Sequence, residues 1–304
     1  MTQKRAYVER EASVTLDPEL PFAAECTNFR YAGRSPISLR LHQGPLWDDR
    51  PCVLLLYEVS SEDQRMDIFG KALRDREAGV RHRMLTIRRD DDHIDAHDPD
   101  LYFTEMPFQH EAGLLAQAEG PVLDVGCGAG RTLLWLEQKG IKATGIDLSS
   151  GAVKVSRLRG CRDVHHGDVM AEGSGLFEEQ KFQTVVLFGN NVGIGGTIEG
   201  AATLLRRLAF LTSPDGHLLV TGLDIAQTDE RHHIAYHDAN LAKGRPRGEI
   251  SMRFEYQGKV SDWVQWFHPE PAELELLANE SGWNVVHVGP ASGPFFAATL
   301  RKSR

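Results

Sequence analysis

The chain has 304 residues, of which 41% are hydrophobic and 25% are charged, and its formal net charge is −9. This length suits one core of about 200 residues with an appendage, and the composition is ordinary for a globular protein. The acidic balance argues against a nucleic-acid partner, because the neutralisation of phosphates requires a basic face.

The four cysteines show no C-x-x-C spacing. The sequence therefore indicates neither a zinc site nor a disulfide framework, and a reducing, cytoplasmic setting is expected. The first residues are followed by no apolar segment typical of a signal peptide, and no apolar run approaches the ~20 residues of a membrane span. We expect no secretion, no membrane partner and no resident metal.

Residues 1 to about 100 are expected to form a separate accessory region. Apolar patterns predict strands at 28–31, 37–41, 52–57 and 84–88. The charged segment 63–76 predicts a helix with Met66, Phe69 and Leu73 facing inward, although Gly70 weakens this helix. This β-rich or α+β appendage would cover the substrate as a lid, form the contact of a homodimer, or stabilise the fold.

Two segments of this region allow alternatives. Pro51-Cys52 is the pair that some pyrimidine-methylating enzymes use as a nucleophile, but Cys52 opens an apolar strand, which favours a core position. Residues 90–100 carry closely spaced aspartates and histidines that are able to bind a metal. Their like charges and Pro99 favour an exposed linker instead.

The next elements lead into a glycine-rich turn. Tyr102 and Phe103 precede a helix predicted over 107–118, and residues 122–131 read VLDVGCGAGR. A short apolar run, three glycines and a following apolar helical pattern predict a buried strand, a tight turn and the start of a helix. Such a turn lets the backbone approach a ligand and leaves helix N–H groups free to donate, which is a geometry that binds nucleotides.

The spacing of the glycines distinguishes two kinds of ligand. A dinucleotide fingerprint, G-x-G-x-x-G, requires a third glycine where Arg131 stands. Gly126-x-Gly128-x-Gly130, with Asp124 two residues before it, resembles instead the first motif of class I S-adenosylmethionine (SAM)-dependent methyltransferases. The sulfonium and ammonium groups of SAM suit a neighbouring carboxylate, whereas a diphosphate would be repelled. The resemblance covers residues 101–304.

From residue 121 onward, strands and helices alternate as in a parallel sheet covered on both faces. We predict strands at 122–125, 142–147, 182–189 and 217–223, and helices at 131–139, 149–158, 198–211 and 271–280. Two final strands, 284–288 and 295–300, have no helix between them, which requires the last strand to run antiparallel. The predicted fold is α/β: a Rossmann-like, doubly wound, seven-stranded sheet with an antiparallel last strand. The resemblance assigns residues 101–304 to a methyltransferase domain.

Acidic residues stand at the ends of successive strands, where a doubly wound sheet binds its ligand. Asp147 ends the second strand and offers two acceptor oxygens to the vicinal hydroxyls of a ribose. Asp168 matches the family position that accepts from the adenine amino group, with Val169 packing on the ring. The resemblance implies a SAM-binding set of Asp124, Gly126, Cys127, Gly128, Gly130, Asp147, Leu148, Asp168, Val169, Phe188 and Gly189.

Candidates for the acceptor side come from four places. Asn190 and Asn191 follow the fourth strand, near the methyl donor in this family, and are expected to orient the substrate; an ordinary glycine-rich loop is the alternative. Tyr102 is a candidate lid residue. Trp266, with Tyr256, Trp263 and Phe267 on a hairpin turning near Gln257-Gly258, is a candidate pocket wall. Core packing is the alternative for these aromatic residues.

Two histidines are candidates for chemistry. His233 and His237 lie four residues apart on one predicted helix face, which suits a general base or a contact with the substrate. A metal pair and plain surface histidines are the alternatives, and no third ligand is identifiable.

The sequence thus favours transfer of a methyl group from SAM to a small-molecule acceptor, a hydroxyl or an amine of a metabolite or natural product. Because the sulfonium is already an activated leaving group, alignment at about 3 Å and exclusion of water supply most of the acceleration. An NAD(P)-dependent oxidoreductase, disfavoured by Arg131 and Asp124, and a non-catalytic SAM-binding or regulatory protein are the alternatives.

Overall fold

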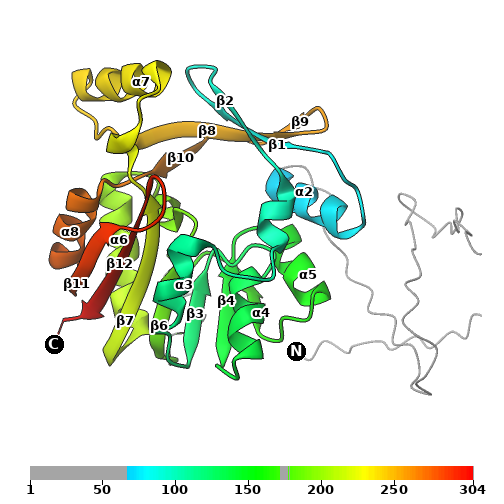
Figure 1. Ribbon diagram of the computed structural model, residues 1–304, viewed down its shortest axis with the longest axis vertical. Helices are drawn as coiled ribbons and strands as arrows, with labels where there is room; N and C mark the ends of the chain where they lie inside the picture. The colour runs from blue at the N-terminus through cyan, green and yellow to red at the C-terminus, as the bar shows by residue number, and fades with distance from the viewer. Residues whose placement is uncertain (1–66, 172–176, 178, 304) are drawn as a thin grey trace, which may run out of the picture. The chain divides into compact units, whose positions relative to one another are not determined.

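The computed structural model of the protein describes residues 67–171, 177 and 179–303. The strands predicted at 28–31, 37–41 and 52–57, and the Pro51-Cys52 pair, lie outside these residues. The described part contains a seven-stranded sheet and a smaller five-stranded sheet, with helices packed around them (Figure 1).

The larger sheet has the strand order β11-β12-β7-β6-β3-β4-β5. Strands β7, β6, β3, β4 and β5 run parallel to one another, whereas β12 runs antiparallel between β7 and β11. This arrangement confirms the predicted Rossmann-like sheet. Its strands are β3 (Val122–Val125), β4 (Ala143–Asp147), β5 (Val164–His166), β6 (Phe182–Leu187), β7 (Thr212–Leu223), β11 (Trp283–Pro290) and β12 (Phe295–Lys302).

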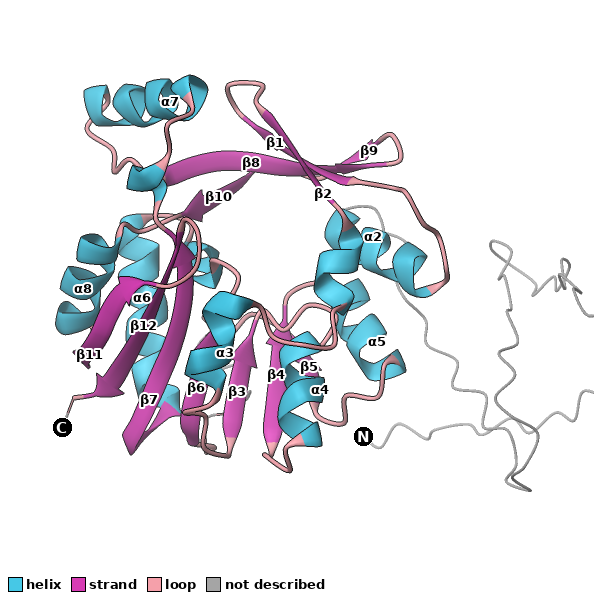
Figure 2. Cartoon of the chain, in the orientation of Figure 1, coloured by secondary structure: helices cyan, strands magenta, loops and turns pink. Residues whose placement is uncertain are grey.

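Helices cover both faces of the larger sheet (Figure 2). Leu123 of β3 belongs to the core on one face and its neighbour Val122 to the core on the other, because successive strand residues point in opposite directions. The first core is closed by α6 (Ile198–Leu211) and α8 (Pro271–Glu280). The second is closed by α3 (Gln109–Leu115), α4 (Arg131–Gln138) and α5 (Ser150–Leu158).

The smaller sheet joins two segments that are far apart in the sequence. Its order is β10-β8-β1-β2, with β9 paired to β8. The strand predicted at 84–88 and the turn at Gln257-Gly258 are confirmed, and both turn residues have the positive φ that a tight hairpin requires. The strands are β1 (Leu85–Arg89), β2 (Ile94–His97), β8 (Glu249–Tyr256), β9 (Lys259–Val260) and β10 (Val264–Phe267).

The expectation of an exposed linker at 90–100 is wrong. β1 and β2 form an antiparallel hairpin in which Arg88 pairs with Ile94, and a 3-10 helix, η1 (Pro99–Phe103), follows. The short, mostly exposed strand β2 gave little apolar signal among its charges. Because β1 also pairs with β8, residues 85–97 share a sheet with residues 249–267. The accessory role of residues 1–100 stays a prediction.

Helix α2 (Ile68–Glu77) packs directly on α5. Gly70 faces this contact: a Cβ there would meet Ser149 Oγ at 2.4 Å, and one on Gly151 would meet the Cα of Gly70 at 2.7 Å. Asp67 caps both helices, since its carboxylate accepts from the Gly70 N–H and the Gly151 N–H, each at 2.8 Å. The glycine that weakened the helix prediction therefore permits the close approach of two helices.

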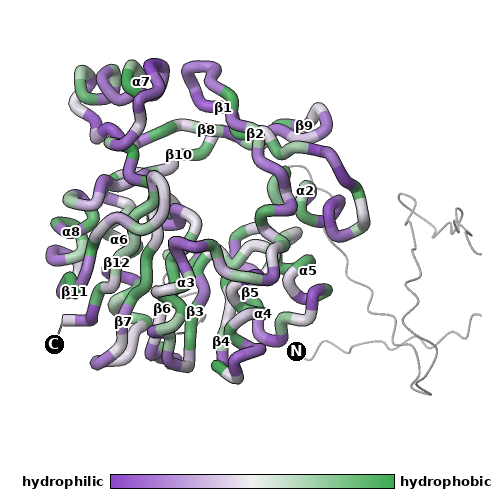
Figure 3. Tube along the Cα trace, viewed as in Figure 1, coloured by the Kyte–Doolittle hydropathy of each residue, from purple (hydrophilic) through white to green (hydrophobic). Residues whose placement is uncertain are grey.

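Helix α7 (Arg231–Ala242), which follows the short helix η3 (Ile225–Gln227), contacts the β1–β2 turn. Tyr236 Oη donates to Asp90 Oδ1 at 2.7 Å, and the Arg89 guanidinium lies 4.0 Å from the centre of the Tyr236 ring. Figure 3 colours this turn hydrophilic, in contrast with the inner strands of the larger sheet. Among the described residues, no helix has the length and apolar character to span a membrane.

Candidate functional site

The glycine turn connects β3 to α4 through three residues with positive φ: +71° at Gly126, +54° at Gly128 and +78° at Gly130. A side chain on Gly126 would meet Asn191 Nδ2 at 2.4 Å, and one on Gly130 would meet Cys161 Sγ at 2.3 Å. At Gly128 the nearest atom, in the ring of Tyr102, would be 3.9 Å away. The turn is therefore least crowded at Gly128, where a ligand can approach the backbone.

Asp147 ends β4 beside this turn. Its Oδ2 accepts from the Gly128 N–H and its Oδ1 from the Ser149 N–H, each at 2.8 Å. Burial raises the pKa of Asp147 to about 6, and the two N–H donors oppose that rise. Each carboxylate oxygen keeps a second lone pair, so Asp147 can still accept from two hydroxyl groups.

Asp124 lies in β3 and is only 4% exposed. Burial raises its pKa to about 7, against the effect of the Arg131 guanidinium. Arg131 Nη2 also binds Glu111 Oε1 at 2.7 Å, and the guanidinium lies over the Phe108 ring. The guanidinium is therefore paired with Glu111 and acts on Asp124 only through space, which leaves Asp124 as the acid of this corner that would attract a further cation.

Glu111 was not identified from the sequence, although it is completely buried. It is the third residue of α3, and its Oε2 accepts from the Phe108 N–H at 3.0 Å. An acid at this position of a helix is the available sequence signal.

Arg159 was also not identified from the sequence. It donates to Ala129 O at 2.6 Å and to Tyr102 O at 3.3 Å, and so fastens η1 to the glycine turn.

Three residues of the expected SAM-binding set, Leu148, Asp168 and Val169, differ in their exposure. Leu148, next to Asp147, is 70% exposed, whereas Val169 is 5% exposed and packs in the main core. Asp168 is exposed and accepts from the Met170 N–H at 2.8 Å. Leu148 thus offers more apolar surface to a planar ring than Val169 does.

Cys127 and Phe188 contribute through backbone and packing. Both side chains are buried in the core that α3 and α4 close. Burial raises the pKa of the Cys127 thiol, so this thiol stays protonated at neutral pH and is a poor nucleophile.

The loop after β6 lies beside the glycine turn. Gly189 has a φ of +68°, and a Cβ there would meet no atom of the described residues within 4 Å. Asn190 Oδ1 accepts from the Leu223 N–H at 2.5 Å, and Asn191 Nδ2 donates to Val125 O and Gly126 O. Both asparagine side chains hold backbone, so their expected role in orienting a substrate stays a prediction.

The aromatic candidates separate into three groups. Tyr102 lies beside the glycine turn, where burial and Asp147 raise its pKa to about 12. Tyr256 and Phe267 are buried in hydrophobic cores, as the alternative of core packing predicted. Trp266 packs against the 3-10 helix η2 (Asn191–Gly195), where a Cβ on Gly193 would meet its Nε1 at 2.0 Å. Trp266 is therefore placed next to the loop that follows β6.

His233 and His237 lie on α7, which Figure 1 draws beyond β8 from the ends of β3 and β4. Arg89 Nη1 contacts His233 Nδ1 at 3.1 Å. Burial lowers the pKa of His237, and Arg89 and Arg247 lower it further. These two histidines do not form the metal pair considered from their spacing, because His233 instead neighbours His232 and His93. Their role as base or substrate contact stays a prediction.

His110 was missed and lies nearer to the strand ends. Its ring stacks on Phe295 with centroids 4.1 Å apart, and Phe295 pairs with Leu223, the last residue of β7. Burial lowers the pKa of His110 below 6.5, so the ring is neutral at pH 7 and can accept a proton. Its position at the start of a helix that precedes the glycine turn gave no sequence signal of its own.

Together, the doubly wound sheet, the glycine turn and the acids at adjacent strand ends define a class I methyltransferase domain, whose cofactor is SAM. A family model described as a methyltransferase domain matches residues 106–288. This match spans more than half of the chain, and the chain belongs to that family.

Two further comparisons describe its relatives. The ubiquinone biosynthesis O-methyltransferase of Alkalilimnicola ehrlichii is 26% identical over 163 residues, which are 53% of this chain and 59% of that protein. The match therefore covers less than two thirds of this relative. The crystal structure of a SAM-dependent methyltransferase from Bacteroides fragilis, in complex with S-adenosyl-L-homocysteine, is 24% identical, with a TM-score of 0.67 over 79% of this chain and 96% of that chain. It shows the same fold.

Proposed function

We propose that this protein transfers the methyl group of SAM to a small molecule, at a hydroxyl oxygen in preference to an amine nitrogen. The observation that carries the proposal is the placement of Asp124 and Asp147 at adjacent strand ends around the glycine turn, with Asp147 hydrogen-bonded to Gly128. The relative named as an O-methyltransferase supports oxygen as the acceptor atom.

The residues present fit the ribose, the adenine and the ammonium group of SAM. Asp147 has acceptor capacity for the ribose hydroxyls, and exposed Leu148 offers an apolar face to the adenine. Asp124 is the acid proposed to attract the ammonium group, since Glu111 is buried and paired with Arg131. When bound, SAM supplies a methyl group on an activated sulfonium, and the protein's task is to align the acceptor and exclude water.

A hydroxyl acceptor loses a proton during the transfer, so a general base helps. Burial lowers the pKa of both His110 and His233, and His110 suits this role better because it lies at the carboxyl end of β7. Its Phe295 neighbour restricts the ring to one plane. We assign proton acceptance to His110 and assign no catalytic role to α7.

Trp266 and the loop after β6 are the proposed acceptor wall. The indole packs on Gly193, and the backbone of Gly189 is open to close approach. An aromatic wall with a few polar groups is typical of sites for small molecules. The formal charge of −9 agrees with such an acceptor and disfavours RNA or DNA.

Calorimetric titration with SAM, S-adenosylhomocysteine and NADH tests the cofactor. We expect binding of the first two and none of NADH. Affinity for NADH without affinity for SAM would overturn the proposal.

Turnover of methyl-labelled SAM against small phenols, small amines and a metabolite extract tests the acceptor. We expect labelled product with a hydroxyl acceptor, and more slowly or not at all with amines. Binding of SAM without turnover in any of these mixtures would indicate a non-catalytic SAM-binding protein.

A further inference from the structure

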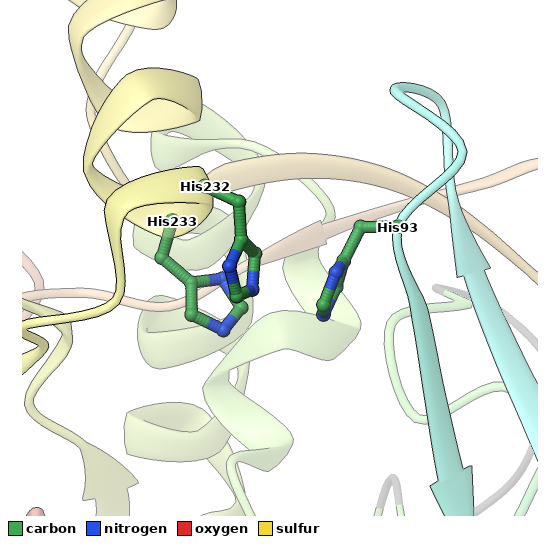
Figure 4. A group of neighbouring side chains, drawn as sticks. All are labelled: His93, His232 and His233. Atoms are coloured by element: carbon green, nitrogen blue, oxygen red, sulfur yellow. The ribbon is translucent and has the colours of Figure 1, made fainter.

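Three histidines meet where α7 contacts the β1–β2 turn. His93 comes from the turn, and His232 and His233 come from the first turn of α7 (Figure 4). The rings of His93 and His232 are 4.2 Å apart between centroids, and those of His232 and His233 are 4.1 Å apart. One ring nitrogen from each residue lies within 4.8 Å of the others.

This geometry is close to that of a metal site. Zinc binds imidazole nitrogen at about 2.0–2.1 Å, so two nitrogens on a tetrahedral ion lie about 3.4 Å apart. The present separations reach 4.8 Å, and the stacked rings of His93 and His232 must turn so that their lone pairs converge on one ion. A set of three histidines, with the fourth coordination position left to water, is an established ligand set for zinc and related ions.

A carboxylate lies near each of two of the three rings. Asp95 Oδ1 lies 3.3 Å from His93 Nε2, and Glu230 Oε2 lies 3.6 Å from His232 Nδ1. Metal-binding histidines commonly donate their second ring N–H to a carboxylate, which fixes the tautomer and orients the ring. These two acids also offset part of the charge of a dication.

Arg89 opposes metal binding at the third ring, that of His233. Its Nη1 lies 3.1 Å from His233 Nδ1, and because a guanidinium only donates, that nitrogen accepts and the neutral ring carries its proton on Nε2. Coordination through Nε2 therefore moves this proton to Nδ1 and breaks the contact with Arg89. Arg89 keeps its two hydrogen bonds to Asp91, at 2.8 and 2.7 Å.

We propose that His93, His232 and His233 bind one divalent transition-metal ion of the zinc class and thereby fasten α7 to the β1–β2 turn. The site is separate from the glycine turn and does not depend on the methyl transfer proposed above. Imidazole ligands select zinc, cobalt, nickel or copper over magnesium and calcium. The sequence indicated metal-binding side chains at 90–100 and a candidate pair at His233 and His237, but not that the two segments meet, because His93 and His232 lie 139 positions apart.

The test uses the full, tag-free chain after treatment with a chelator. Titration with Zn²⁺ by calorimetry, and with Co²⁺ by its visible absorption, is expected to show one ion per chain that Mg²⁺ does not displace. His93→Ala and His232→Ala should each weaken binding at least about 100-fold, whereas the control His287→Ala, an exposed residue on β11, should bind as the wild type does. Zinc should raise the Tm of the wild type and not that of the two variants.

Arg89→Met provides a second test, because it removes the donor that competes with the metal for His233 while keeping a long side chain. We expect tighter zinc binding, by several-fold, in this variant, and circular dichroism checks that all variants are folded. No binding by the wild type, or binding that survives both His93→Ala and His232→Ala, would overturn the proposal. If either alanine variant is unfolded, His93→Gln and His232→Gln replace it with the same expected loss.

Discussion

The carboxyl edge of the larger sheet and the interface between α7 and the β1–β2 turn are both rich in charged and polar groups, yet they are built in opposite ways. At the sheet edge, Asp147 binds Gly128 and Ser149, which are 19 and 2 positions away. At the interface, Arg89 contacts His233 across 144 positions and Asp90 contacts Tyr236 across 146. The first region is encoded in one βαβ unit, whereas the second exists only in the folded chain.

This difference separates two tasks. The sheet edge presents acids at fixed places beside the glycine turn, whereas the smaller sheet joins segments that are distant in the sequence. Substitutions at the edge should change the affinity for SAM, and substitutions near the loop after β6 should change turnover or the KM of the acceptor. The predictions below would sharpen or break this division.

The largest expected effect is at the proposed base. His110→Gln should lower kcat for a hydroxyl acceptor about 100-fold, the lower range for loss of a general base, and leave the Kd of SAM within about twofold. Single-turnover kinetics and calorimetry measure the two quantities. His287→Gln serves as the control because His287 is exposed on β11. An unchanged kcat would remove His110 from the mechanism.

Asp147→Ala should weaken SAM binding by about 1.5 to 3 kcal/mol, the typical contribution of a hydrogen bond to a charged group. The loss also frees the Gly128 N–H that Asp147 now binds. Calorimetric titration gives the Kd, and Asp215→Ala, at an exposed residue early in β7, is the matched control. Wild-type affinity in Asp147→Ala would mean that the ribose is bound elsewhere.

Trp266→Ala should raise the KM of the acceptor by a factor that corresponds to about 1 to 2 kcal/mol, the order of the burial free energy of a large apolar side chain. The Kd of SAM should stay unchanged. Trp263→Ala, at a position 46% exposed, is the control. If SAM binding and the acceptor KM changed equally, Trp266 would contribute to folding rather than to an acceptor wall. Steady-state kinetics with both substrates varied distinguishes these results.

The last prediction concerns the dependence of stability on pH. The pKa of Asp124 is raised from 3.8 to about 7 in the folded chain, so between these values the folded state holds a proton that the unfolded state has lost. This group therefore lowers the stability as the pH rises through the window, by up to about 1.4 kcal/mol per pH unit. In urea unfolding, the free energy of unfolding of Asp124→Asn minus that of the wild type should be more favourable to the variant at pH 7.5 than at pH 5. Equal differences at both pH values would show that Asp124 does not titrate there.

The sequence predicted those parts of the fold whose signals are local. The helices at 198–211 and 271–280 and the strand at 122–125 have the expected bounds, because their apolar periodicity and caps lie within the segment. β7 begins at Thr212 rather than at 217, because residues 212–216 continue as extended backbone of the strand beside β6.

The site, like the fold, was predictable where its contacts are local in the sequence. Asp147 and the glycine turn meet as expected, since one βαβ unit brings them together. The side chains of Asn190 and Asn191 bind backbone groups of other strands, which no spacing in the sequence reveals. Glu111 and Arg131 pair across 20 positions between two helices, and His93 joins α7 only through the hairpin. These contacts depend on tertiary packing.

The pairing of β1 with β8 has a consequence for the order of assembly. Arg88 and Glu255 meet at 2.7 Å although 167 positions separate them, so bringing their strands together closes a long stretch of chain at a high entropic cost. That cost falls once the intervening parallel sheet has formed and holds the two ends near each other. The smaller sheet should then be the last part to form and the first to open, with faster amide hydrogen exchange in β1 than in β3.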